Sequence, residues 1–461
     1  MLLSIEKLIY GGDGLARTPT GADGRSMAVF VPFVLPDEKI DADIRHEKSG
    51  FARGRVTRLI EPSPDRIEAR CPYFQQCGGC HYQHIRYEQQ LQFKAAILRE
   101  TLQRIAKIDL QSEIRLHFSP PYHYRNRTRL RVRTKPEFAL GYFRFGSHEF
   151  LSVRECPISS PLLNRAIARL LDLGGLNCPE TVEEIELFSD ASDERGLAWA
   201  FCHREAAQQT QDLLRWADSI HRDLPEISGM TFFPSRHKSP ARAPADRKPP
   251  QRTKQRPQRQ TEEQTEDDPS ADAKPLAQSG AKSILYRAAN RDYQVSAGAF
   301  FQVNRHLVDE MVSTVTANVA GDIALDLYAG VGLFSAALAP FFRHIFAVEA
   351  SQTAHSDLVH NVPANVKAAG ARTEDYLRSR PVQTRPDLVV LDPPRTGIGR
   401  TVTNSLVELG APRVRYVSCD PATLARDIVP LLAAGYRIEE AHLFDLFPET
   451  FHIESVMLLT R

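Results

Sequence analysis

The sequence lacks several features that would place it quickly in a class of protein. Its 461 residues include only seven cysteines, and no run approaches the ~20 apolar residues that cross a bilayer as a helix. The 58 lysines and arginines nearly balance the 57 aspartates and glutamates, so the formal net charge is +1. These absences argue against a membrane-spanning protein. They also require any affinity for nucleic acid to come from local basic patches rather than from the overall charge.

The amino-terminal stretch also lacks the apolar segment of a secretory signal peptide, because Glu6 interrupts it too early. We therefore expect a cytoplasmic protein. In that compartment, clustered cysteines bind metals or take part in catalysis more often than they form disulfides. Three of the seven cysteines lie close together in the segment "CPYFQQCGGC", namely Cys71, Cys77 and Cys80.

The spacing of these three cysteines, C-x5-C-x2-C, differs from the C-x3-C-x2-C of radical S-adenosylmethionine enzymes. It indicates a site that needs a fourth ligand, and Cys156 is the best placed, since its Cys-Pro pair repeats that of Cys71 and Pro72. Cys178 and Cys202 have no such context, and we interpret them as structural. Zinc and a 4Fe–4S cluster both suit four thiolates, and the spacing alone does not choose between them.

The composition changes along the chain, which is too long for one ordinary hydrophobic core. Short apolar runs separated by Gly, Asp and Pro predict an OB-like β-barrel over residues 1–68, either a nucleic-acid adaptor or a plain small β domain. A central α+β domain is expected over residues 69–284. Within it, residues 234–283 are rich in Pro, Arg and Gln, so we expect a disordered insertion there. Residues 285–461 would form a third domain.

The segment "YRNRTRLRVR" of the central domain carries an arginine at every second position. In a strand, these side chains would all lie on one face, where they would repel one another unless they met phosphate or an acidic partner. The pattern therefore predicts an RNA-phosphate contact surface, with a solvated strand face as the alternative. The arginines are Arg125, Arg127, Arg129, Arg131 and Arg133.

Residues 285–461 alternate short apolar strands with segments of helical length. This order is typical of an α/β domain with a parallel, doubly wound, Rossmann-like sheet. In such sheets, ligands bind at the carboxyl ends of the strands. Four predicted strands end in polar or glycine-containing turns: "IALDLYAG", "HIFAVEAS", "DLVVLDPP" and "RVRYVSCDP".

The first two of these strands end in features that suit a nucleoside. One runs through Asp326 into Gly330 and Gly332, and the next ends at Glu349. Glycines let the backbone approach a ligand closely, and a strand-end acid can bind ribose hydroxyls. The stretch lacks the patterns of a phosphate-binding loop, so it predicts a cofactor without pyrophosphate, for which S-adenosylmethionine is the natural candidate. The alternative is a structural turn beside a solvated glutamate.

The remaining strand ends carry candidate chemistry. Asp392 would point into the crevice. Cys419 lies between an apolar strand and a helix whose N-terminal amides favour a thiolate, so it is a candidate nucleophile rather than a buried small residue. Glu454 shares a strand face with His452 among apolar residues, and a partly desolvated carboxylate there suits a general base. A buried ion pair is the alternative for that acid.

Five motifs then occur in the order of a known family: "FFQVN", "DLYAGVG", "DPPRTG", "SCDPATLARD" and "HIESV". Together they resemble the RNA 5-methyluridine methyltransferases. Residues 1–68 look like the TRAM domain of that family, and the cysteine segment with "ECPIS" is similar to its iron–sulfur site. The resemblance covers nearly the whole chain outside 234–283, and it implies a class I S-adenosylmethionine-dependent methyltransferase domain.

The resemblance also implies roles for individual residues. Cys419 would be the nucleophile, and Glu454 would be the base. S-adenosyl-L-methionine would contact Gln302, Tyr328, Glu349 and Asp392. A 4Fe–4S cluster, in preference to zinc, would be held by Cys71, Cys77, Cys80 and Cys156.

The expected substrate is RNA, with ribosomal RNA favoured over transfer RNA by resemblance, and we expect a monomer. Two other functions are alternatives to uridine methylation. A non-catalytic RNA-binding homologue would have no need of both Cys419 and Glu454. A cytosine-5 RNA methyltransferase would typically carry a Pro-Cys pair where this chain has Asp392-Pro393-Pro394.

Overall fold

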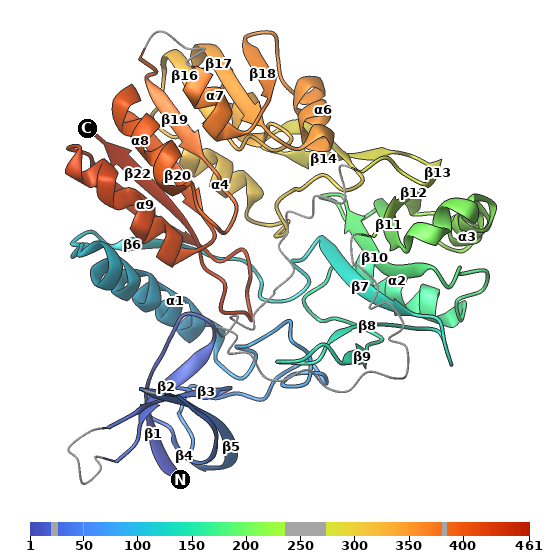
Figure 1. Ribbon diagram of the computed structural model, residues 1–461, viewed down its shortest axis with the longest axis horizontal. Helices are drawn as coiled ribbons and strands as arrows, with labels where there is room; N and C mark the ends of the chain where they lie inside the picture. The colour runs from blue at the N-terminus through green and yellow to red at the C-terminus, as the bar shows by residue number, and fades with distance from the viewer. Residues whose placement is uncertain (20–25, 49, 236–272, 380–384) are drawn as a thin grey trace, which may run out of the picture.

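The computed structural model describes residues 1–19, 26–48, 50–235, 273–379 and 385–461. It contains a closed β-barrel, a seven-stranded sheet, an eight-stranded sheet and a separate two-stranded hairpin (Figure 1). No helix in these ranges is long and apolar enough to cross a bilayer.

The amino-terminal residues form the closed five-stranded barrel that the sequence predicted. Its strands alternate inward apolar and outward polar residues, so that Leu3 and Ile5 are buried while Ser4 and Glu6 are exposed. The strands are neighbours in the order β1-β2-β3-β5-β4. They are β1 (Leu2–Leu8), β2 (Asp13–Arg17), β3 (Ala28–Pro32), β4 (Lys39–Lys48) and β5 (Phe51–Glu61).

The central region folds as a seven-stranded sheet in the order β13-β12-β11-β10-β7-β8-β9. Helices α2 (Pro161–Asp172) and α3 (Thr210–Asp223) pack against it with amphipathic faces. The strands are β7 (Arg127–Arg133), β8 (Ala139–Phe143), β9 (Phe150–Ser152), β10 (Val182–Ser189), β11 (Gly196–Cys202), β12 (Ile227–Pro234) and β13 (Ala277–Gly280).

Strand β13 corrects one boundary of the expected disordered insertion. Residues 277–280 belong to the polar stretch 234–283, yet they pair antiparallel with β12. Backbone hydrogen bonds to an existing sheet edge are independent of side-chain hydrophobicity, which explains why composition did not reveal this strand. Residues 236–272 of the expected insertion lie outside the described residues.

The carboxyl-terminal region forms an eight-stranded sheet in the order β18-β17-β16-β19-β20-β22-β21-β6. The first five strands of this order are mutually parallel, as the sequence predicted, and β22 runs antiparallel to β20. The strands are β6 (Ile114–His117), β16 (Gly321–Leu327), β17 (Phe342–Glu349), β18 (Val366–Gly370), β19 (Leu388–Leu391), β20 (Arg413–Ser418), β21 (Arg437–Phe444) and β22 (Glu454–Thr460).

Apolar residues of the eight-stranded sheet point alternately into two cores. Ala324 and Val390 belong to one core, and Leu325 and Val389 to the other. The first core packs against the hairpin β14 (Ser283–Ala288) and β15 (Arg291–Ser296), with helices α4 (Val308–Val315), α5 (Leu333–Leu338) and α6 (Gln352–Asn361). The second lies under helices α1 (Tyr87–Thr101), α7 (Thr373–Ser379), α8 (Gly399–Leu409) and α9 (Pro421–Ala433).

Helix α1, although it precedes the central sheet in the sequence, packs with the carboxyl-terminal sheet. Helix α1 contacts α9, and β6 extends the sheet by pairing parallel with β21 (Figure 1). Both elements come from the range that the sequence assigned to the central domain. The cysteine segment 71–80 immediately precedes this helix, so it is tied closely to the carboxyl-terminal part of the chain.

Candidate active site

The carboxyl ends of the parallel strands bring the predicted cofactor residues to one edge of the sheet. Glu349 ends β17, Tyr328 follows β16 and Asp392 follows β19, and these three strands are neighbours. The Asp392 amide donates to the carbonyl oxygen of Leu327 at 3.4 Å, which ties the two turns together. Tyr328 adopts a left-handed backbone (φ 66°), which turns the chain sharply as it leaves the strand.

Glu349 is fixed by two backbone amides. One carboxylate oxygen accepts from the Gly330 amide at 2.8 Å, and the other accepts from the Ser351 amide at 2.7 Å. Gly330 has a φ of 54°, and a Cβ added there would meet no atom within 4 Å, so the loop faces open space. The glycine turn and the strand-end acid thus form one rigid cradle, open on the side where a ligand would approach.

Gln302 joins this group from a separate segment. Its Nε2 donates to Asp392 Oδ2 at 3.4 Å, and its backbone oxygen accepts from Asn126 Nδ2 at 2.9 Å. Asn126 precedes β7, so the central region contributes to the support of the predicted cofactor residues. The "FFQVN" and "DPPRTG" motifs therefore meet in space, as their shared predicted role requires.

Asp326, near the end of β16, is a further acidic side chain close to the predicted cofactor residues. Its side chain is fully buried, and Oδ2 accepts from the Ser335 hydroxyl while Oδ1 has no hydrogen-bond partner among the described residues. Burial raises the pKa of this carboxyl to about 7. Its position at the end of β16 was visible in the sequence, but its unpaired oxygen was not.

Cys419 directly follows strand β20, and Glu454 is the first residue of its antiparallel neighbour β22. Ser418, the last residue of β20, pairs with Ser455 of β22, and the Ser455 hydroxyl donates to the Ser418 carbonyl at 3.3 Å. Extending this register by one residue sets Cys419 against Glu454. Glu454 is 6% exposed, and Cys419 is half-buried. The predicted nucleophile and the predicted base thus lie next to a paired position of two neighbouring strands.

The segment after Cys419 is held by a helix cap. Asp420 Oδ1 accepts from the backbone amides of Ala422 at 2.9 Å and Thr423 at 2.8 Å, at the first turn of α9. The cap fixes the direction in which the chain leaves β20. Cys419 therefore stands on a rigid strand-to-helix turn at the ligand-binding edge of the sheet.

The loop between β21 and β22, which leads to Glu454, is buried and anchored by helix α1. Lys94 and Asp445 form an ion pair at 2.6 Å with both side chains fully buried, and Lys94 also donates to the Phe447 carbonyl. Gln90 Nε2 donates to Glu449 Oε2 at 3.1 Å. The backbone oxygen of Glu449 accepts from the two amides that follow Cys80. The cysteine segment and the loop before Glu454 are thus directly joined.

Glu449 should make stability depend on pH. Burial raises the pKa of this carboxyl from 4.5 to about 7, so the folded protein binds a proton more tightly than the unfolded chain. Its stabilising contribution is present below pH 4.5 and is lost as the pH rises through about 7. The stability of Glu449→Gln relative to wild type should therefore rise as the pH is raised from 5 to 8, by up to about 3 kcal/mol. Thermal unfolding at both pH values measures this gain, with exposed Glu137→Gln as the control. An equal difference at both pH values would contradict the assignment.

Two further side chains approach the same edge. Arg395 of "DPPRTG" lies 3.4 Å from His452, measured from Nη2 to Nδ1. Burial, followed by the charge of Arg395, lowers the pKa of His452, so this imidazole is neutral near pH 7. Tyr10 of the barrel places its hydroxyl 3.5 Å from the carbonyl oxygen of Cys419. The sequence gave no signal for Tyr10, because a residue of the first domain must cross the molecule to reach this site.

The four candidate metal ligands lie in one region. The pKa of the Cys77 thiol is raised to about 12, mainly by burial and in part by the neighbouring Cys156. Burial and Cys156 likewise raise the pKa of Cys71 and Cys80, so the four thiols lie within electrostatic reach of one another. In the part of the chain that the structure describes, no three His, Cys, Asp or Glu side chains are arranged to hold a metal ion.

The backbone around these cysteines is well anchored. Cys156 is held on both sides by Asn164, whose Oδ1 accepts from the Cys156 amide at 2.8 Å and whose Nδ2 donates to its carbonyl at 3.0 Å. The backbone of Cys77 forms an isolated antiparallel β-bridge with Arg144, and the Cys77 sulfur accepts from the Gly79 amide at 3.4 Å. Amide hydrogen bonds to sulfur are typical of cysteines that ligate metals.

Three arginines of the strand that was predicted to contact RNA phosphate pair with glutamates of the same chain. Glu184 and Glu186 of β10 lie directly across from Arg131 and Arg129 of β7. Glu186 binds both Arg127 and Arg129, with Arg129 Nε at 2.9 Å from Oε2, and Arg131 pairs with Glu184. Although burial acts to raise the pKa of Glu186, the charges of Arg127 and Arg129 hold it below its usual value.

Aromatic rings complete the environment of this strand. Four guanidinium groups lie over rings at 4.5–5.0 Å from the ring centroids. The pairs are Arg127 with Trp199, Arg129 with Phe201, Arg131 with Phe143 and Arg133 with Phe150. The acidic partner that a row of arginines requires is therefore present within the chain, on strand β10.

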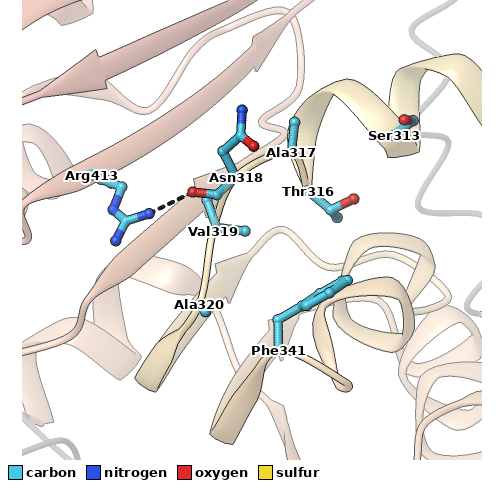
Figure 2. A pocket seen from close by; sticks show the side chains of 8 residues that line it. All are labelled: Ser313, Thr316, Ala317, Asn318, Val319, Ala320, Phe341 and Arg413. Carbon is cyan, nitrogen blue, oxygen red and sulfur yellow. Dashed lines mark hydrogen bonds between the residues drawn. The ribbon is translucent and has the colours of Figure 1, made fainter.

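A surface hollow lies at the opposite edge of the eight-stranded sheet. Ala320 precedes β16, Phe341 precedes β17 and Arg413 opens β20, so the hollow is at the amino ends of the strands. Figure 2 shows Arg413 donating to the backbone oxygen of Asn318, at 2.8 Å. This hollow is separate from the edge that carries Cys419 and the predicted cofactor residues.

Known proteins resemble this chain in sequence and fold. A family model described as tRNA (Uracil-5-)-methyltransferase matches residues 281–379 and 381–461. The 23S rRNA (uracil(1939)-C(5))-methyltransferase RlmD of Halomonas elongata is 31% identical over 480 residues, covering 99% of this chain and 89% of that protein. An uncharacterized RNA methyltransferase of Halalkalibacterium halodurans is also 31% identical, over 99% of this chain and 96% of its own length.

A solved structure shares the whole fold. The tRNA (uracil-54, C5)-methyltransferase of Pyrococcus abyssi, in complex with S-adenosyl-L-homocysteine, superposes with a TM-score of 0.71. Both chains are covered completely, at 24% sequence identity. With the two full-length relatives, the family model and the ordered motifs at one sheet edge, the chain belongs to the RNA 5-methyluridine methyltransferase family and is an RNA (uracil-5-)-methyltransferase.

Proposed function

We propose that the protein methylates C5 of a uridine in RNA through a covalent adduct between Cys419 and C6 of the base, with S-adenosyl-L-methionine as the methyl donor. The observation that carries this proposal is the pairing of Ser418 with Ser455 at the carboxyl edge of the sheet, because Cys419 directly follows the first of these residues and Glu454 directly precedes the second. One side chain is a nucleophile and the other a base, and the reaction needs one of each.

The first role belongs to Cys419. Uracil C5 is too weak a nucleophile to be methylated unaided. The Cys419 thiolate forms a bond to C6, and the electron pair of the C5–C6 double bond moves onto the C4 carbonyl oxygen as an enolate. The enolate makes C5 nucleophilic, which splits one difficult step into two easier ones. The target uridine must leave its stack to reach this edge, at a cost of a few kcal/mol.

The second role belongs to Glu454. After methylation, C5 still carries its original proton. The Glu454 carboxylate accepts that proton, the released electron pair restores the C5–C6 double bond, and the Cys419 thiolate leaves C6. Glu454 is nearly buried, which suits a base that must take a proton from a bound substrate.

The donor would occupy the cradle beside these residues. When bound, S-adenosyl-L-methionine supplies an electrophilic methyl group on its sulfonium. Glu349 would accept from ribose hydroxyls, Tyr328 and Asp392 follow the adjoining strands, and Gln302 joins them from a separate segment. The open space beside Gly330 fits a ligand at this position.

We further propose that Cys71, Cys77, Cys80 and Cys156 hold a 4Fe–4S cluster, with zinc as the alternative. Four thiols from two segments form the donor set that such a cluster requires, and the Gly79 amide already faces one sulfur. Protein purified without oxygen should therefore be brown and contain iron and sulfide in equal amounts. Cys156→Ser should lose most of the iron, whereas Cys178→Ser should keep it. Zinc in place of iron, or full iron in the Cys156→Ser variant, would contradict this assignment.

The RNA target is proposed to be large-subunit ribosomal RNA. Full-length relatives named as 23S rRNA methyltransferases favour it, whereas the solved structural relative is named for transfer RNA. We place this reaction in the cytoplasm, performed by a monomer. Incubation of the protein with S-adenosyl-L-methionine and each unmodified RNA, followed by mass spectrometry of the nucleosides, tests the reaction and its RNA target. We expect 5-methyluridine in ribosomal RNA; methylation of transfer RNA alone would correct the target, and no 5-methyluridine in either would refute the function.

A further inference from the structure

The tip of the β1–β2 hairpin leaves the barrel and enters the active-site region. The tip turns at Gly11 and Gly12, both with positive φ, and Gly12 packs so closely that an added Cβ would lie 3.2 Å from His81. His81 in turn packs edge-on against Phe451, with the ring centroids 4.6 Å apart. Figure 1 shows the barrel directly below α1 and the carboxyl-terminal sheet. The barrel is therefore fixed against the catalytic part of the chain at this tip.

Tyr10, at the same tip, touches the segments that carry both catalytic candidates. Its hydroxyl lies 3.5 Å from the carbonyl oxygen of Cys419. Its ring meets Phe451 edge-to-face, with the ring centroids 5.6 Å apart. Phe451 precedes Glu454 by three residues in the buried loop between β21 and β22. One side chain thus contacts the nucleophile's backbone and the loop that leads to the base.

The electrostatic surroundings agree with this contact. Burial, followed by the negative charge of Asp420, raises the pKa of Tyr10, so its hydroxyl keeps its proton and acts as a donor. Asp420 also caps α9 directly after Cys419. Cys419 is consequently held between a helix cap and a phenol from the barrel.

Building on the proposed function, we infer that Tyr10 is a positioning residue that sets the Cys419 turn relative to the Glu454 loop, so that the barrel is part of the active-site framework. Tyr10 reaches the Cys419 carbonyl from the barrel, whereas strand β20 and the cap on α9 hold the two ends of the turn. Small displacements of a nucleophile lower rates without weakening substrate binding. Loss of Tyr10 should therefore change turnover more than affinity.

The test measures adduct formation directly. RNA containing 5-fluorouridine traps the Cys419 adduct after methyl transfer, because the base cannot remove fluorine as a proton. At saturating RNA and S-adenosyl-L-methionine, Tyr10→Ala should form this adduct roughly tenfold more slowly than wild type. Tyr10→Phe keeps the ring contact but loses the hydroxyl, and should slow adduct formation about threefold. Ile60→Ala, an exposed substitution on β5 of the barrel, should react at the wild-type rate.

Binding measurements separate positioning from RNA contact. The dissociation constants of both tyrosine variants for RNA and for S-adenosyl-L-methionine should match those of wild type. Wild-type adduct rates in both variants, or a loss of RNA affinity that accounts for the slower rate, would overturn the inference. If Tyr10→Ala does not fold, Tyr10→Phe alone decides, and a wild-type rate from it overturns the inference. Failure of the wild-type protein itself to form an adduct would instead refute the proposed function.

Discussion

Replacing Cys419 by alanine should abolish 5-methyluridine formation while leaving S-adenosyl-L-methionine binding unchanged. The thiol is the only proposed route to an enolate at C5, so the rate should fall by at least about 10⁴-fold, as when a covalent nucleophile is removed. The cradle of Glu349, Gly330 and Ser351 does not involve Cys419, which is why affinity for the cofactor should survive. Methyl transfer and equilibrium binding, measured on the same preparation, test the two halves of this prediction.

The matched control is Cys178→Ala. Cys178 is half-buried in the central region and packs beside the hydrophobic core of the seven-stranded sheet, away from the strand ends of the eight-stranded sheet. Its loss should leave methylation near the wild-type rate. Normal turnover by the Cys419→Ala protein would rule out covalent catalysis by this residue.

Replacing Glu454 by glutamine should have the second large effect, an accumulation of covalent enzyme–RNA complex. The amide cannot accept the C5 proton, so the methylated base stays attached to Cys419, and its release should slow by about 10²–10⁴-fold. The substitution preserves size at a nearly buried position where Phe444 is the strand partner of Glu454, so packing should be retained. Denaturing gel electrophoresis with labelled RNA detects the complex.

Glu439→Gln, on the exposed face of the adjoining strand β21, is the control for this charge change. It should release methylated RNA as wild type does. Free release of methylated RNA by the Glu454→Gln protein at the wild-type rate would assign the base to another group. The Arg395–His452 pair is the next candidate, since it lies at the same sheet edge.

The sequence predicted the features that depend on local pattern. Alternating apolar residues predicted the barrel, and all-apolar runs predicted the parallel strands β16, β17, β19 and β20. Because ligands meet the carboxyl ends of such strands, the candidate cofactor residues could be assigned to one edge without knowledge of the fold. The adjacency of Cys419 and Glu454 also depends on β22 running antiparallel to β20, which no local pattern specifies.

The arginine strand shows where local pattern is insufficient. A row of five cations indicates a need for negative charge but does not say where that charge comes from. In the fold, Glu184 and Glu186 lie across the strand pair, and the rings of Trp199 and Phe201 cover the guanidinium groups. Partners more than 50 residues away in sequence were therefore decisive.

Tyr10 and strand β13 escaped prediction for a related reason. Tyr10 acquires its neighbours only when the barrel docks against the Cys419 turn, and the two residues are 409 positions apart in the sequence. Strand β13 forms because β12 presents a free sheet edge, although its own residues are polar and small. Both depend on surfaces created by the rest of the fold.

The most direct test of the covalent mechanism is the site of attachment in the trapped complex. The Glu454→Gln protein is incubated with RNA and S-adenosyl-L-methionine, digested with nuclease and protease, and analysed by tandem mass spectrometry. We predict a methylated uridine residue joined to the peptide that contains Cys419, and to no other peptide. Attachment to a different cysteine, or methylated RNA with no attached peptide, would contradict the account.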